Sequence, residues 1–219
     1  GLHSAYTFVL LLGRKLAPDF VRTHYETLSA YPAHWPTISF SNHDVPRTVS
    51  RFGGEHPPPE LARLLLALLL SLKGTTLIYQ GEELGLPQSD ILFEELTDPP
   101  GIRFWPEYKG RDGCRTPMPW EEGEAPNGFT TGTPWLPVKA PQAALNAAGQ
   151  EADPDSMLAF YRRMLAWRKS QDALIDGGIA FFNTAEPVLA FRRSSESGDL
   201  LCVFNLSPQV ETVTIAGLS

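Results

Sequence analysis

The stretch "WPTISFSNHD", residues 35–44, places a short β-branched and aromatic segment directly before three polar residues. The first six residues predict a buried strand, which ends where Asn42, His43 and Asp44 begin. A turn at this point would need only one Asn or Asp, since a single such side chain can bond back to the backbone. The other two polar groups therefore indicate a site rather than a turn alone.

The segments that follow this strand predict a helix and a second strand. The sequence from residue 59 to residue 72 is nearly continuous in leucine, which predicts a helix buried on most of its circumference. "TTLIYQG", residues 75–81, predicts a second buried strand that stops at its glycine. Strand, helix and strand, with both strands apolar on both faces, indicate parallel βαβ units. In such folds the loops after the strands share one edge of the sheet, where ligand sites are built.

Three further parts of the chain give distinct predictions. Residues 18–30 show the apolar spacing of an amphipathic helix, and residues 87–150 form long Pro- and Gly-rich loops whose aromatic residues argue against disorder. "DPDSMLAFYRRMLAWRKS", residues 153–170, predicts a helix with Asp153 or Asp155 as its N-cap.

From residue 178 onward the apolar period becomes two, which predicts a small antiparallel β unit. Its expected strands are "GIAFFNT" (178–184), "VLAFRRSS" (188–195), "LLCVFNLS" (200–207) and "QVETVTIAG" (209–217). The "ESGD" segment between the second and third of these is expected to be a hairpin loop.

Composition excludes several classes of protein. The 219 residues are 42% hydrophobic and carry 18 basic against 25 acidic side chains, for a net charge of -7. With no basic run, neither nucleic acid nor an anionic membrane is an expected partner. The longest apolar run is interrupted by Arg63 and Lys73, so it predicts a core helix and no membrane span. Cys114 and Cys202 indicate unpaired thiols in a reducing compartment, and the expected location is the cytoplasm.

The residues suited to chemistry begin with Asp44. A carboxylate at the end of a buried strand, followed by Arg47 and Arg51, belongs either to a functional polar cluster or to a buried structural ion pair. His43 is either a donor to a ligand hydroxyl or a core histidine, and Asn42 can serve as a turn cap alone. Metal binding is a weak alternative, because no second ligand residue stands at metal spacing nearby.

Two other charged groups have similar alternatives. Glu82 and Glu83 are either an acid and base pair or structural residues that cap a turn or form a salt bridge. Arg111, Asp112 and Arg115 either clamp a carboxylate or sugar hydroxyls through the planar guanidinium fork, or brace a long loop. Exposed tryptophans would suit the C–H faces of sugar rings, but the tryptophans of this region could equally be core residues.

Three segments in order carry a family resemblance: "FSNHDVPRTVSRFG", "GTTLIYQGEELGLPQ" and "GRDGCRTPMPWE". Together they resemble the α-amylase superfamily of glycoside hydrolases (family thirteen), and within it the α-glucosidase and oligo-1,6-glucosidase branch. The resemblance implies an α/β fold in which residues 1–176 are the last βα units of a TIM (β/α)8 barrel, with a long insertion at 87–150. Residues 177–219 would begin a partial C-terminal antiparallel β domain. Because such a barrel takes about 250 residues, and the chain has no initiator Met, we expect it to be a C-terminal fragment.

The resemblance also implies roles for particular residues. The family hydrolyses with retention, which needs a nucleophile and a separate acid/base about 5 Å apart, and in the family both come from strands before this chain begins. The fragment alone is therefore expected to be inactive. By resemblance, Asp44 binds the 2- and 3-hydroxyls of the sugar and stabilises the transition state, His43 binds the same hydroxyls, and Arg111 contacts the sugar. Asp112 and Arg115 would support that loop.

Gln88 stands where many members of the branch carry Glu near the leaving group, and it is assigned to substrate binding. Asn42 and Arg47 are assigned to supporting positions. The expected partner is a small α-glucoside, with no metal and no cofactor in this part of the chain. Two alternatives remain: a transglucosylase or sucrose isomerase of the same superfamily, and a non-catalytic hydrolase-like ectodomain that accompanies a transporter.

Overall fold

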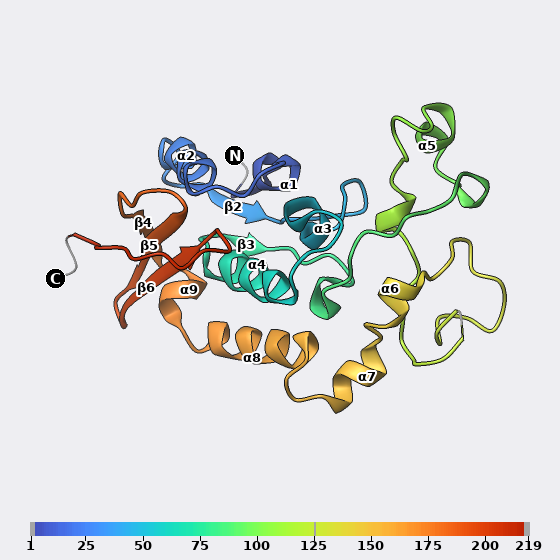
Figure 1. The fold of residues 1–219 in the computed structure, drawn as a ribbon. Helices are drawn as coiled ribbons and strands as arrows, with labels where there is room; N and C mark the ends of the chain where they lie inside the picture. The colour runs from blue at the N-terminus through green and yellow to red at the C-terminus, as the bar shows by residue number, and fades with distance from the viewer. Residues whose placement is uncertain (1–2, 125, 217–219) are drawn as a thin grey trace. The chain divides into compact units, whose positions relative to one another are not determined.

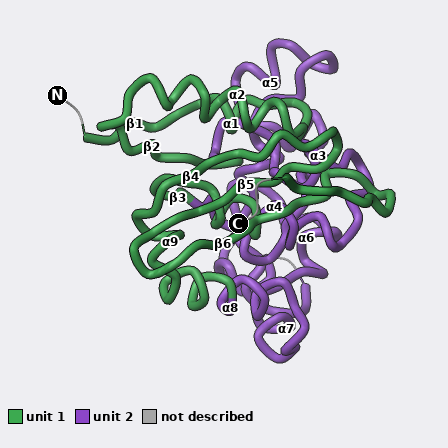
Figure 2. Tube along the Cα trace, turned by 90° about the vertical axis from the view of Figure 1, so that its left-hand side faces the viewer, with its two compact units in different colours: residues 1–40, 66–77, 164–219 green, residues 41–65, 78–163 purple. Residues whose placement is uncertain are grey.

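The computed structural model describes residues 3–124 and 126–216 (Figure 1). The chain divides into two compact units, drawn in different colours in Figure 2. Unit 1 holds residues 1–40, 66–77 and 164–219, and unit 2 holds residues 41–65 and 78–163. The predicted domain boundary after residue 176 is a different division of the chain, and it stays a prediction.

Unit 1 contains a parallel sheet of three short strands in the order β1-β2-β3. These strands are β1 (Ser4–Tyr6), β2 (Trp35–Ile38) and β3 (Thr75–Thr76). In register, Tyr6 lies opposite Thr37, and Thr37 lies opposite Thr75. The parallel pairing of the two predicted strands is confirmed. Strand β1 is not among the predictions, because three residues with mostly exposed side chains have no apolar alternation to detect.

The predicted helices form close to their expected limits. Helix α2 (Pro18–Ser29) begins with proline in its first turn and carries Asp19 there, next to the positive end of the helix dipole. A short helix α1 (Val9–Leu12) precedes it, and α3 (Thr48–Gly53) and α4 (Pro59–Ser71) follow β2. Most leucines of α4 are buried, as their near-continuous run predicts, while Leu61 and Leu64 are partly exposed.

A three-stranded antiparallel sheet completes unit 1, in the order β4-β5-β6. Its strands are β4 (Gly178–Phe181), β5 (Val188–Ser195) and β6 (Gly198–Asn205), and Ser195 pairs with Gly198 across a two-residue turn. The predicted hairpin is therefore confirmed. The strand predicted over 209–217 is wrong for residues 209–216, which form no ladder and include a Val210 that is 98% exposed. Gly217 lies outside the described residues.

The core of unit 1 joins this sheet to helix α2 through aromatic rings. Tyr25 of α2 lies 5.6 Å from Phe181, which lies 5.4 Å from Phe191, and Phe191 stacks on Phe204 at 5.9 Å between centroids. Burial raises the pKa of the Tyr25 hydroxyl, which donates to the Lys73 carbonyl oxygen at 2.7 Å. This aromatic row and its hydroxyl bond fix α2 against β4 and the segment before β3.

Buried arginines satisfy backbone carbonyls in the same unit. Arg193 donates to the carbonyl oxygens of Ser71, Gly177 and Gly178 at 2.7 to 3.0 Å. Arg168 donates to Leu70 in the same way. Because the last carbonyls of a helix have no partner inside it, these guanidinium groups supply donors to two of them, those of Leu70 and Ser71, at the end of α4.

Unit 2 is built mainly from loops with short helical turns. These turns are η1 (Glu82–Leu84), η2 (Phe93–Glu95), α5 (Pro99–Arg103), η3 (Asp112–Cys114), α6 (Ala140–Ala143) and α7 (Ala147–Ala152). Two apolar clusters hold them together, one centred on Leu84, Leu86 and Met118 and the other on Ile91, Leu96 and Leu136. The aromatic-rich loops are thus packed, while Trp120 and Trp135 are half exposed and are not core residues.

The helix predicted over residues 153–170 is α8 (Met157–Lys169), but neither predicted N-cap is correct. The residue that precedes its first turn is Ser156, whose Oγ accepts from the amide of Ala159 at 3.1 Å. Asp153 Oδ1 instead accepts from the amide of Asp155 at 2.8 Å, inside the preceding turn. Asp153 accepts from a nearby amide of its own turn, so its side chain does not cap α8, and Ser156 is the N-cap instead. A last helix, α9 (Asp172–Ile175), precedes β4.

None of the described helices is long and apolar enough to span a membrane. Cys114 and Cys202 are both free and buried.

Candidate active site

The polar triplet lies in the loop that joins β2 to α3. Asn42 Oδ1 accepts from the backbone amide of Asp44 at 2.8 Å, which closes an Asx-turn. Asn42 therefore shapes the turn, and the side chains of His43 and Asp44 are left for other contacts.

Both ends of this loop are attached to one carboxylate. Glu82 Oε1 accepts from Ser41 Oγ at 2.6 Å and from Thr48 Oγ1 at 2.7 Å, and Glu82 Oε2 accepts from the amide of Tyr79 at 3.0 Å. Burial raises the pKa of Glu82 above its usual range. Glu83 Oε2 accepts from the amide of Gly81 at 2.7 Å. The carboxylates of Glu82 and Glu83 thus bind backbone amides and hydroxyl groups of the surrounding turns, which agrees with the structural alternative predicted for this pair.

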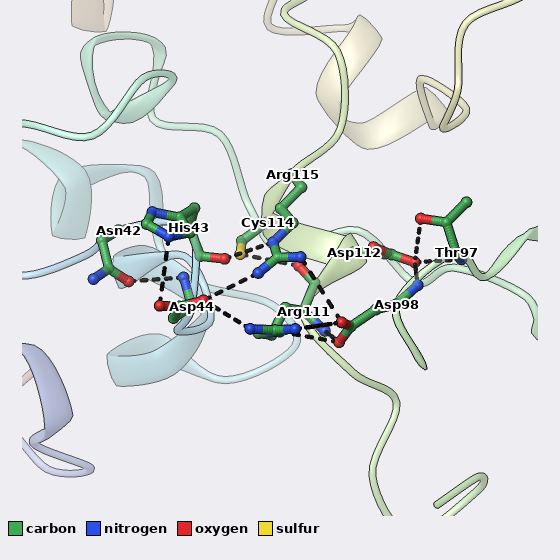
Figure 3. Close-up of polar contacts among 9 residues, drawn as sticks. All are labelled: Asn42, His43, Asp44, Thr97, Asp98, Arg111, Asp112, Cys114 and Arg115. Atoms are coloured by element: carbon green, nitrogen blue, oxygen red, sulfur yellow. Dashed lines mark hydrogen bonds and ion pairs between the residues drawn. The ribbon is translucent and has the colours of Figure 1, made fainter. Parts of the chain in front are cut away.

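Asp44 is held by two arginines (Figure 3), and its side chain stays partly exposed to solvent. Arg111 Nη1 and Arg115 Nη2 donate to Asp44 Oδ1 at 3.1 and 3.0 Å, and His43 Nε2 lies 3.5 Å from Asp44 Oδ2. The side chain of Asp44 is 47% exposed and that of His43 is 67% exposed. Asp44 is therefore not a buried structural ion pair, and His43 is not a core histidine.

Behind the arginines lies Asp98, a residue absent from the predicted site. Its side chain is fully buried, and it accepts from Arg111 Nη2 at 2.6 Å, from Arg111 Nε at 3.1 and 3.2 Å and from the Arg111 amide at 2.9 Å. The hydrogen bonds from Arg111 hold the pKa of Asp98 below its usual range, and the same bonds raise the pKa of Arg111. The available signal was the "TDPP" pattern, but Asp before Pro reads first as a helix N-cap.

Asp112 supports Asp98 from the other side. Its Oδ2 accepts from the amide of Thr97 at 2.6 Å, from Thr97 Oγ1 at 3.1 Å and from the amide of Asp98 at 2.8 Å. Arg115 reaches back to the triplet, because its Nε donates to the carbonyl oxygen of His43 at 2.7 Å. Through these contacts Asp112 and Arg115 support the loop that carries Arg111.

Arg47 and Gln88 brace the triplet loop from within. Arg47 is 2% exposed, and its Nη1 donates to the carbonyl oxygen of Gln80 at 2.8 Å. Burial lowers the pKa of Arg47. The side-chain oxygen Oε1 of Gln88 accepts from the backbone amide of Arg47 at 2.9 Å, and the backbone amide of Gln88 donates to Ser50 Oγ at 2.8 Å. The assigned role of Gln88 in substrate binding stays a prediction, with its side-chain oxygen already engaged.

This arrangement suits the binding of hydroxyl groups. Oδ1 of Asp44 takes both arginine bonds, while Oδ2 lies 3.5 Å from His43 Nε2. A half-exposed carboxylate accepts, and an imidazole or guanidinium donates, so neighbouring hydroxyls of one ligand can be bound together. Among residues 3–124 and 126–216 there is no group of three His, Cys, Asp or Glu side chains that could hold a metal ion.

Comparison with known proteins gives a consistent result. The model of the family described as "Alpha amylase, catalytic domain" matches residues 14–177. A probable α-glucosidase of Rhizobium meliloti is 45% identical over 213 residues, which are 96% of this chain and 38% of that protein. An oligo-1,6-glucosidase of Heyndrickxia coagulans is 36% identical, over 79% of this chain and 35% of that protein.

Solved structures agree with these relatives. The crystal structure of an α-glucosyl transfer enzyme, XgtA, matches with a TM-score of 0.89 and 48% identity, over 94% of this chain and 38% of that chain. The trehalulose synthase MutB from Pseudomonas mesoacidophila MX-45 matches with a TM-score of 0.80 and 28% identity, over 94% of this chain and 42% of that chain.

The family model and the solved structures define the class of fold, that of the α-amylase catalytic domain. The chain belongs to the α-amylase family. The predicted fold class, the last βα units of a (β/α)8 barrel followed by antiparallel strands of the C-terminal domain, is confirmed. The chain spans about 38% of the length of the first curated relative it matches.

Proposed function

We propose that this chain supplies one part of the active site of an α-glucosidase that cleaves small α-glucosides. The observation that supports the proposal is the half-exposed Asp44 carboxylate, held by Arg111 and Arg115 in a site suited to hydroxyl groups. The nucleophile and the acid/base are proposed to lie outside these 219 residues, since the chain spans little more than a third of its relatives.

In the proposed mechanism, Asp44 accepts hydrogen bonds from sugar hydroxyls while positive charge develops on the ring. Bonds to the 2-hydroxyl that strengthen in this oxocarbenium-like state lower the barrier. His43 and Arg111 donate to the same sugar from either side of Asp44. Gln88 would contribute its side-chain NH₂, because its oxygen accepts from Arg47. Asn42, Arg47, Asp112 and Arg115 hold these groups in place.

Transfer of the glucosyl group to a second sugar is the other candidate. It is favoured by the solved structures, which include an α-glucosyl transfer enzyme and a trehalulose synthase. The residues of the candidate site serve hydrolysis and transfer equally. The two are separated by incubating the enzyme with sucrose and comparing free glucose with the glucosyl units found in new saccharides, because hydrolysis releases the glucosyl unit as glucose whereas transfer retains it in a new glycosidic bond.

The test uses the full-length gene product that contains this chain. We expect release of p-nitrophenol from p-nitrophenyl α-glucoside, and we expect Asp44→Asn to lower kcat by about a hundredfold or more, the size of one transition-state interaction. Asp90→Asn is the matched control, because the Asp90 side chain is 72% exposed and pairs only at the surface with Lys109 at 2.5 Å. We expect this control to keep its activity.

Full activity in Asp44→Asn would contradict the role of Asp44. A folded full-length protein that hydrolyses and transfers no α-glucoside would contradict the proposed function, and would favour the non-catalytic transporter-associated alternative. The 219-residue chain by itself is expected to show no turnover.

A further inference from the structure

A fully buried carboxylate lies behind the arginines of the candidate site and cannot reach a substrate itself. The side chain of Asp98 is 0% exposed, whereas that of Asp44 is 47% exposed. We propose that Asp98 is a positioning residue, which orients Arg111 and balances the charge of Arg111 and Arg115 so that Asp44 can serve a neutral sugar. This inference rests on the proposed function of Asp44.

The geometry of Arg111 supports the positioning role. Its guanidinium is divided between two carboxylates, with Nε and Nη2 bonded to Asp98 and Nη1 bonded to Asp44 (Figure 3). A planar fork held by two of its nitrogens can rotate little, so the direction of the third is set by Asp98. The backbone amide of Arg111 also donates to Asp98, which fixes the start of the same side chain.

Asp98 is itself held rigidly. Asp112 Oδ2 accepts from the Asp98 amide at 2.8 Å, and a Cβ added at Gly110 would lie 2.8 Å from Asp98 Oδ2. Gly110 has a positive φ of 77° and leaves room for the buried carboxylate. The bond to Asp112 and the close approach of Gly110 therefore restrict the placement of Asp98, and with it the direction of Arg111.

The charges support the second half of the proposal. Arg111 and Arg115 bring two positive charges to the exposed Asp44, and Arg115 Nη1 also lies 3.8 Å from Asp98 Oδ1. With Asp98 present, two carboxylates face two guanidinium groups. Without it, two cations at a partly open site would face one carboxylate, and an inorganic anion would be attracted to them.

The experiment compares Asp98→Asn with the control Asp90→Asn in the full-length gene product. For Asp98→Asn we expect kcat on p-nitrophenyl α-glucoside to fall by about tenfold to a hundredfold, with a smaller change in KM, because the lost interaction acts in the transition state. We also expect inorganic phosphate to inhibit it at concentrations about tenfold below those needed for wild type. A merely structural role would not change the response to phosphate. Asp98→Glu, which restores the charge, should restore wild-type phosphate tolerance while kcat stays low.

Suppose that wild type turns over the substrate and that Asp98→Asn matches Asp90→Asn in kcat and in its response to phosphate. This result would overturn the inference about Asp98 and leave the proposed function intact. If wild type has no α-glucosidase activity, the proposed function fails. The charge-balancing role of Asp98 is then judged by calorimetric titration of phosphate into the two variants, and equal affinities would refute it. If circular dichroism shows that Asp98→Asn is unfolded, Asp98→Glu decides the matter, and a wild-type kcat in that variant would be contrary to positioning.

Discussion

Arg111 Nη1 lies 3.1 Å from Asp44 Oδ1, an ion pair between residues that are 67 positions apart in the chain. It joins the polar triplet to the loop that carries the second charged motif. Because Arg111 uses its remaining nitrogens on Asp98, the contact depends on the planar fork and not on charge alone.

We therefore predict that Arg111→Lys is not a conservative change. Lysine keeps the positive charge but cannot bond two carboxylates in fixed directions. In the full-length enzyme, kcat/KM should fall by about tenfold or more, since a charge-assisted bond contributes about 1.5 to 3 kcal/mol. Arg162→Lys, in the exposed pair with Glu151, is the control and should leave kcat/KM unchanged. Wild-type kcat/KM in Arg111→Lys would show that charge suffices.

The second prediction concerns pH and Glu82. Burial raises the pKa of this carboxyl above its usual value of 4.5. As the pH rises from 4.5 through the folded pKa, the folded state keeps a proton that the unfolded state releases, so the contribution of Glu82 to stability is full below 4.5 and declines above it. The glutamine of Glu82→Gln is neutral at every pH and does not lose this contribution. The free energy of unfolding of the variant, relative to that of wild type, should therefore increase from pH 4 to pH 8.

Urea unfolding of wild type and Glu82→Gln over this pH range measures the difference. Glu94→Gln, at an exposed position, provides the comparison. The difference in free energy of unfolding between Glu94→Gln and wild type should not increase in this way with pH. A gap between Glu82→Gln and wild type that widens with pH, to the disadvantage of the variant, would refute the prediction.

The third prediction concerns Gly81, which precedes the Glu82 turn. Its φ is +90°, and an added Cβ would lie 2.5 Å from Arg47 Nη1 and 2.7 Å from Leu86 Cδ1. Because Arg47 is buried and cannot move into solvent, Gly81→Ala should cost about 2 kcal/mol or more, from backbone strain and overpacking together.

Gly85→Ala is the matched change, since Gly85 also has a positive φ, of +70°, but the nearest atom to its Cβ would be 3.4 Å away. It should cost only the backbone term of about 1 kcal/mol. Thermal unfolding of both variants measures the difference, and equal losses would indicate that Arg47 yields to the added methyl group.

The fourth prediction concerns Arg193 in β5, whose buried guanidinium has its pKa lowered to about 10 by desolvation. It donates to three backbone carbonyls, and Arg193→Met would leave these acceptors buried without a donor. We expect a loss of about 2 kcal/mol or more in the free energy of unfolding. The neighbouring Arg192→Met removes a partly exposed arginine 3.6 Å from Asp199 and should cost less than about 1 kcal/mol. Similar losses in urea unfolding would argue against the carbonyl network.

Local patterns in the sequence predicted the regular elements well. Helices α2 and α4 and the β5–β6 hairpin follow from apolar spacing and turn residues, because each is stabilised by neighbours a few positions away. Strand β1 and the true cap of α8 were missed for the opposite reason. A three-residue strand exists only through its pairing with β2, and the choice of Ser156 over Asp153 depends on which amide is nearer in space.

For the site, the order of residues along the chain shows which polar residues stand together, Asn42 to Asp44 and Arg111 to Arg115, and three ordered motifs indicate the family that uses them. The exposure of Asp44, and the buried Asp98 behind its arginines, follow instead from tertiary contacts. Burial and ion pairing depend on how the loops pack. The contact between Asp98 and Arg111 forms only when the loop between them folds, so their spacing along the chain does not predict it.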